Sequence, residues 1–266
     1  MNARNVVVVV LVMLFLLPIE VSANETQRIK KLDTISDEAL QMVKTYRYDD
    51  ANKLLKFFQE EFLTVTSNGH IFSMDELRVI TVAYNDAADA LGATEIEHQE
   101  RVNKVTKFRL VLDAVLSTYQ PLWTELEAPI MTVFSEMKTA VENGDNEDFY
   151  ENLDSFLSLY NVIYPSLKID ITPTKIQQIN ARVNYIDQFR PEILTETASL
   201  EELMVLEEEL KSLFSNRMKE DETDPSLWWV IICTGSIIIA TLSYVGWRKF
   251  KAERERRLNR LKERKN

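Results

Sequence analysis

The chain has 266 residues, a formal net charge of −11 and a single cysteine. One cysteine excludes an intrachain disulfide, and a strongly acidic balance disfavours nucleic acid as a partner. The charge is uneven, because the last nineteen residues carry ten Lys or Arg against three Glu.

The N-terminus predicts a cleaved signal peptide. Residues 6–17 form a twelve-residue apolar run, which is too short for a comfortable membrane span, and Val21-Ser22-Ala23 supplies the small residues that precede a cleavage site. We expect residues 1–23 to be removed after Ala23. The alternative is an uncleaved anchor, which leaves the following domain on the same side of the membrane.

Residues 24–218 are expected to form an acidic, all-α extracytoplasmic domain of helical hairpins, either a bundle or a short solenoid. This region holds three glycines, each between segments whose apolar residues recur every three or four positions. The expected helices cover roughly 26–45, 50–64, 73–91, 94–120, 121–143, 147–164, 172–190 and 199–213.

Caps and prolines set the expected helix ends. Capping boxes predict helix starts at Ser73, Thr94 and Ser199, each with Glu three residues later. Pro129 is expected to bend its helix, and Pro165 to end the helix that begins near Glu147, because proline lacks an amide donor.

Two segments of this domain resemble each other at an offset of 98 residues. Asp49-Asp50-Ala51 through Phe58 aligns with Glu147-Asp148-Phe149 through Phe156. One interpretation is an internal duplication into two halves of three or four helices, whose concave joint is the place to bind a ligand. The other is a chance match between amphipathic hairpins.

A polar linker over 219–226 separates the domain from an expected transmembrane helix over 227–247. This stretch contains no charged side chain, and its length fits a bilayer core of about 30 Å. Aromatic anchors are expected at Trp228, Trp229 and Trp247. The basic residues that follow predict a cytoplasmic tail over 248–266, which also contacts anionic lipid headgroups, and they begin with Arg248, Lys249 and Lys251.

Small residues on one face of this expected span, Ser236 and Ala240, permit close helix packing and thus a homodimer.

No catalytic or cofactor motif is present. The two histidines, His70 and His98, lie outside zinc-binding spacings, and a metal pair of His98 with Glu95 is weaker than the interpretation of both as solvated helix residues. We expect no cofactor, no metal and no enzymatic activity.

The layout resembles the YpjB family of sporulation proteins from endospore-forming bacteria. The resemblance rests on the signal ending at Val21-Ser22-Ala23, the acidic helical domain, the Leu227-Trp228-Trp229 entry to the span and the Trp247-Arg248-Lys249-Phe250 exit. Membership implies a role in spore formation at the membrane of the sporulating cell.

Two functions follow from this layout. The first is a non-enzymatic membrane protein whose domain binds another protein or an envelope component. The alternative is a sensor or signalling subunit, which passes the ligand state of the domain through the span to a cytoplasmic partner. An envelope hydrolase is disfavoured, because consecutive carboxylates fan around a helix and do not converge on one bond.

Overall fold

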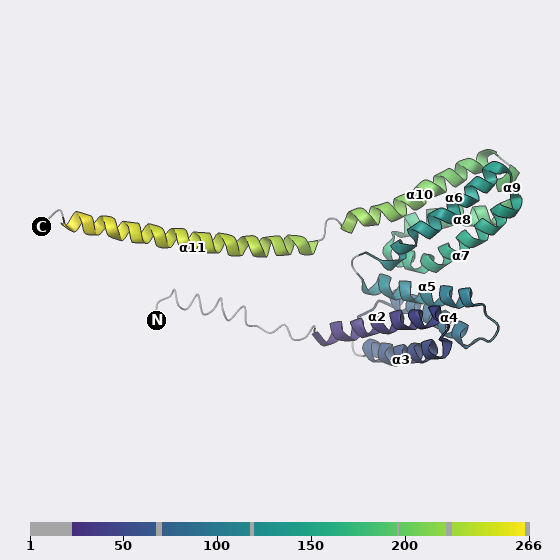
Figure 1. The fold of residues 1–266 in the computed structure, drawn as a ribbon, viewed down its shortest axis with the longest axis horizontal. Helices are drawn as coiled ribbons and strands as arrows, with labels where there is room; N and C mark the ends of the chain where they lie inside the picture. The colour runs from purple at the N-terminus through teal and green to yellow at the C-terminus, as the bar shows by residue number, and fades with distance from the viewer. Residues whose placement is uncertain (1–22, 68–70, 118–119, 196, 222–224, 264–266) are drawn as a thin grey trace. The chain divides into compact units, whose positions relative to one another are not determined.

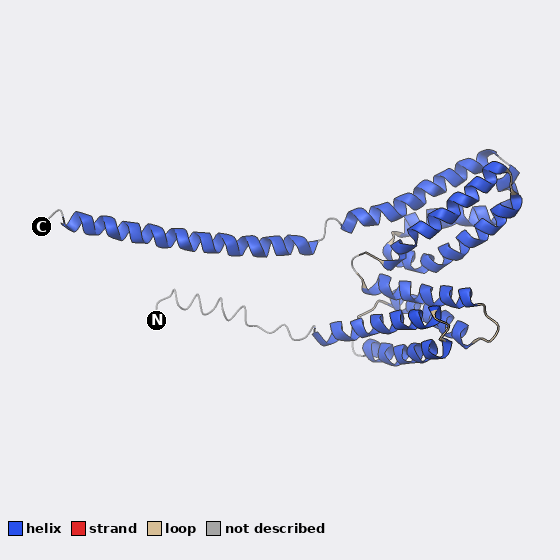
Figure 2. Cartoon of the chain, viewed as in Figure 1, coloured by secondary structure: helices blue, strands red, loops and turns tan. Residues whose placement is uncertain are grey.

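A computed structural model describes residues 23–67, 71–117, 120–195, 197–221 and 225–263, and every regular element within them is a helix (Figures 1 and 2). The predicted all-α class is confirmed for these residues. They form two compact units, one that ends at Phe214 and one that begins at Ser215. Residues 1–22 of the predicted signal peptide lie outside the described residues, and Ala23 is the first residue of helix α2.

The first half of the domain is a closed bundle of four helices. These are α2 (Ala23–Lys44), α3 (Tyr48–Ser67), α4 (Met74–Gly92) and α5 (His98–Leu116). Each helix packs on the next, and α5 returns to pack on α2 (Figure 1). Apolar residues at helical spacing fill the centre, including Leu32, Leu55, Phe58, Ile80, Phe108 and Leu112.

The second half contains a 3-10 turn and five helices. These are η1 (Leu122–Leu126), α6 (Glu127–Asn143), α7 (Asn146–Asp170), α8 (Pro173–Gln188), α9 (Arg190–Thr195) and α10 (Thr197–Asp221). A separate core lies between them and includes Ile130, Phe134, Phe156, Ile179, Leu206 and Leu210. The two halves meet where α7 packs on α5.

The two halves repeat each other at the 98-residue offset. The helix pairs α2/α6, α3/α7 and α5/α10 correspond at this offset, and α4/α8 correspond at 99. Matching positions are buried in both halves: Leu32/Ile130, Leu55/Leu153, Phe58/Phe156, Ile80/Ile179, Val105/Leu203, Phe108/Leu206 and Leu112/Leu210. This agreement over all four helices favours duplication over a chance match.

The turn that follows α2 and the turn that follows α6 are built alike. Tyr46 and Gly144, 98 positions apart, both have a left-handed backbone, with φ of 63° and 69°. The amides of Arg47 and Asp145 each donate to a carbonyl five residues back, in the manner of a helix that ends in a Schellman motif. The local geometry therefore repeats along with the cores.

Two predictions based on proline were wrong. Pro165 lies inside α7, which continues to Asp170. Proline in a helix interior costs about 3 kcal/mol, but burying Ile163 and Leu167, both fully enclosed, contributes about 2 kcal/mol each. Pro129 lies in the first turn of α6, where its missing amide breaks no helical hydrogen bond, so it opens the helix instead of bending it.

The capping predictions gave mixed results. The box at Ser73 is confirmed, because its hydroxyl accepts from the Glu76 amide and the Glu76 carboxylate accepts from the Ser73 amide. The box at Thr94 was wrong, since α5 begins at His98 after an N-cap without a side-chain hydrogen bond. Helix α10 begins at Thr197, so Ser199 is not its cap.

The C-terminal unit contains α11 (Pro225–Glu263), a helix of 39 residues (Figure 1). The predicted span over 227–247 and the first part of the predicted tail are both helical within it. Among the residues that the structure describes, no helix combines the length and the apolarity that crossing a membrane requires. Helix α10 reaches Asp221, inside the segment predicted to be a linker.

Candidate binding surfaces of the helical domain

Arg101 is buried and holds the turn between α4 and α5. Its guanidinium donates to the carbonyls of Ala90 at 2.8 Å, Ala93 at 2.6 Å and Ile96 at 3.1 Å. It also lies over the ring of Tyr48, 4.7 Å from the centroid. A helix leaves its last carbonyls without partners, and here one side chain satisfies them. Arg101 is therefore a structural group and not a binding group.

A second buried arginine joins α2 to α5. Arg109 Nη1 lies 2.9 Å from Asp33 Oδ1 and 3.8 Å from Asp113 Oδ1. Asp113 in turn accepts from the Leu122 amide at 2.7 Å, which joins α5 to η1. Burial raises the pKa of Asp113, against the opposing effects of the Leu122 amide and Arg109. This cluster ties three elements together.

The second half carries the same pair with its charges reversed. Glu207 and Lys211 stand 98 positions after Arg109 and Asp113. Glu207 accepts from Lys138 of α6 and from Lys211, both at 2.6 Å, and these hydrogen bonds lower its pKa. An ion pair thus joins the last helix of each half to the first.

The histidine considered as a metal ligand has a structural role. His98 Nδ1 lies 2.8 Å from the Tyr48 hydroxyl, and its ring stacks on Tyr46 with centroids 3.8 Å apart. The start of α5 is thereby fixed to the turn between α2 and α3. Within the described residues no group of three or more His, Cys, Asp or Glu is arranged to hold a metal ion, and His70 lies outside them.

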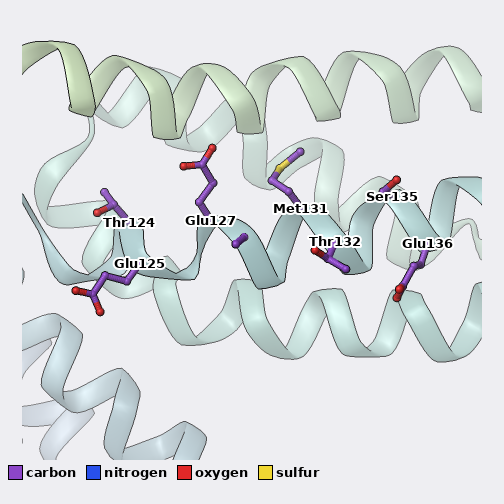
Figure 3. A pocket seen from close by; sticks show the side chains of 8 residues that line it. Thr124, Glu125, Glu127, Met131, Thr132, Ser135 and Glu136 are labelled. Atoms are coloured by element: carbon purple, nitrogen blue, oxygen red, sulfur yellow. The ribbon is translucent and has the colours of Figure 1, made fainter.

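An open groove with a volume of 720 Å³ runs along α6. Figure 3 shows Glu127 and Met131 on one side of the helix and Glu125 and Glu136 on the other. Three carboxylates and no cation line this groove, so it favours cationic groups. The other residues that line it are Thr124, Ala128, Thr132 and Ser135.

A smaller hollow of 230 Å³ lies where α4, α5 and α7 meet, at the joint of the two halves. Its cations are Arg78, Lys107 and Lys168, of which Lys107 pairs with Asp86 at 2.9 Å. Val79, Val82, Ala83, Tyr164 and Pro165 complete the lining. This joint hollow is basic and half apolar, in an otherwise acidic domain.

A third groove of 460 Å³ runs between α8 and α10. Lys175 and Gln178 stand on α8, and Val205, Glu208 and Glu209 stand on α10. One carboxylate oxygen of Glu209 is buried and finds no hydrogen-bond partner among the described residues. Lys175 of α8 donates to the Ser212 hydroxyl of α10 at 3.3 Å, and Arg182 of α8 pairs with Glu202 and Glu209 of α10, so the two helices are joined beneath the groove.

The predicted membrane-anchoring residues all fall on α11. Trp247, Arg248, Lys249 and Lys251 are exposed on this helix. Trp228 and Trp229 are helical, but their side chains lie outside the described part. The predicted dimer face has Ser236 exposed, and the side chain of Ala240 is not described, so the homodimer stays a prediction.

Comparison with known proteins identifies one family. The family model described as "Sporulation protein YpjB (SpoYpjB)" matches residues 29–259. A protein of Bacillus subtilis (strain 168), named "Uncharacterized protein YpjB", is 35% identical over 263 residues, which cover 98% of each chain. No solved structure matches the chain.

Proposed function

The chain belongs to the YpjB family of sporulation proteins, and from this premise we propose that it is a non-enzymatic, single-pass membrane protein whose extracytoplasmic helical domain binds a protein or an envelope component. Span and tail hold that domain at the surface of the sporulating cell.

The proposed anchor rests on the sequence of residues 227–247. That stretch has no Asp, Glu, Lys or Arg, and a cluster of basic residues follows it at once. Such a cluster is retained in the cytoplasm, which assigns the domain to the other side of the membrane. Helix α11 continues through both segments without a break.

One observation supports the binding role: buried charged side chains join helices, whereas other carboxylates line open grooves. Arg101, Arg109 and Asp113, all at most 8% exposed, hold helices together. Other carboxylates, those of Glu125, Glu127 and Glu136, line the open groove along α6. Open grooves suit a macromolecular surface, whereas catalysis on a small substrate calls for an enclosed site with convergent polar groups.

Crosslinking in sporulating cells tests this role. The full chain is expected to yield a reproducible adduct with one protein or envelope polymer, and a chain lacking residues 24–218 is expected to lose it. Turnover of envelope polymers by the purified chain, with no adduct in cells, would overturn the proposal.

The joint hollow supports the second candidate, a sensor subunit. Arg78 and Lys168 line it beside the ion pair of Lys107 with Asp86, which favours an anionic ligand, and the joint connects both halves. Deleting residues 248–266 separates the two functions. An anchor loses only its orientation in the membrane, whereas a signalling subunit inserts correctly and loses its function.

A further inference from the structure

The repeat relates a covered surface in the first half to an open one in the second. In the first half, the outer face of α5 is covered by α7. Asn103 donates to the Ser158 hydroxyl at 3.1 Å, and Leu110, 5% exposed, joins the core of the second half. A helix therefore occupies this face of α5 along its length.

The corresponding face of α10 has no such cover among the described residues. Glu201 stands at the position of Asn103, Met204 at that of Thr106 and Glu208 at that of Leu110. All three are exposed, and Met204 is 58% exposed. The groove between α8 and α10 runs beside this face.

We propose that the α8–α10 groove, with the outer face of α10, docks a basic amphipathic helix of a partner protein in the way that α5 docks α7. The proposal rests on the binding role above and names its site and its partner. The apolar side of the incoming helix covers Met204 and Val205. Its Lys or Arg side chains meet Glu201 and Glu208.

Charge selects the basic partner over a neutral helix. Asn103 contacts Ser158 of α7, and Glu201 stands at the position equivalent to Asn103. The incoming helix therefore meets a carboxylate there instead of an amide. Likewise, the buried Leu110 is replaced by the exposed Glu208. Glu201 and Glu208 are seven residues apart, two turns along one helix face, so the partner carries cations at a similar spacing.

Charge also disfavours a second copy of this chain as the occupant. The counterpart of α7 is α3, and the counterpart of Ser158 is Glu60, an exposed residue. Docking α3 of another copy would set Glu60 against Glu201, and like charges in contact oppose association. Head-to-tail assembly of identical chains is thus disfavoured at this face.

Photocrosslinking with the full chain in sporulating cells tests the proposal. A photoreactive residue replaces Met204 on the outer face of α10, beside the α8–α10 groove, or, separately, Thr132 in the α6 groove. We expect an adduct from position 204. Mass spectrometry should identify the attached peptide as a helix-forming segment with Lys or Arg residues about two turns apart.

The charge-reversed variant Glu201→Lys/Glu208→Lys should reduce that adduct at least about fivefold. Glu201→Gln/Glu208→Gln should reduce it less, and the control Glu142→Lys/Glu151→Lys, with equal charge change at exposed sites near the α6–α7 turn, should leave it unchanged. Glutamates introduced at the partner's identified cations should restore it with the charge-reversed variant.

The outcomes separate the two proposals. Three results would overturn the docking site and leave the binding role standing. They are adducts from position 132 alone, a neutral or acidic peptide at position 204, and an adduct that is insensitive to charge reversal in a variant with normal circular dichroism. Adducts from neither position would overturn both.

Discussion

Replacing Arg101 should destabilise the domain more than replacing any exposed arginine. The side chain is 6% exposed, and it donates to four carbonyls, at 2.6 to 3.4 Å, at the end of α4 and in the turn that follows. Hydrogen bonds from a charged group contribute about 1.5–3 kcal/mol each but are not additive when one group makes them all. We therefore expect Arg101→Ala to lower the free energy of unfolding by about 3–5 kcal/mol.

Denaturant unfolding of the full chain in detergent micelles, followed by circular dichroism, measures this loss. Arg101→Lys should recover about half of it, because one ammonium reaches fewer carbonyls than the guanidinium. The exposed Arg78 on α4 is the matched control, and Arg78→Ala should change stability by less than about 0.5 kcal/mol. A loss below about 1 kcal/mol for Arg101→Ala would refute the structural role assigned to this side chain.

Three further substitutions test the repeat and its charges. Gly144→Ala should cost about 1 kcal/mol in thermal unfolding, because a side chain opposes φ of 69° although no atom lies within 4 Å of the added carbon; no loss would contradict the strain argument. Glu207→Gln should cost about 0.5 kcal/mol at pH 7, and because its ion pairs with Lys138 and Lys211 are lost as pH falls through its lowered pKa, the deficit should shrink as the pH falls below the ordinary value of 4.5. The raised pKa of Asp113 has the opposite effect on stability. Its contribution is greatest below the ordinary value of 3.8 and is lost as pH rises through the raised pKa, so Asp113→Asn should gain stability relative to the unchanged chain as pH rises above 3.8. Parallel pH profiles for these last two variants would contradict the assigned environments.

Periodicity predicted the helices well, because their apolar stripes are strong. The stripe of α10, for instance, is buried at each expected position: Leu203, Leu206, Leu210 and Leu213. Its start was missed, since a serine followed by glutamate also occurs inside helices. The extent of α7 was missed because Pro165 gives a local signal, whereas the burial that outweighs it comes from the tertiary fold.

The repeat was visible in the sequence only in part. Equivalent core positions hold side chains of different size in the two halves. Phe134 and Phe149 stand at the positions equivalent to Ser36 and Ala51, so residue identity at the offset is low. An alignment of buried positions, instead of residue types, reveals the repeat. The role of Arg101 carries no sequence signal, because its partners are backbone carbonyls in a turn whose conformation was not predicted.

Protease treatment of intact protoplasts from sporulating cells tests the proposed topology most directly. The account predicts that the protease digests residues 24–214 and leaves an epitope placed after residue 266 protected until the membrane is permeabilised. Digestion of that epitope together with survival of the helical domain would contradict the assigned orientation, and with it the proposal that the domain binds a partner outside the cytoplasm.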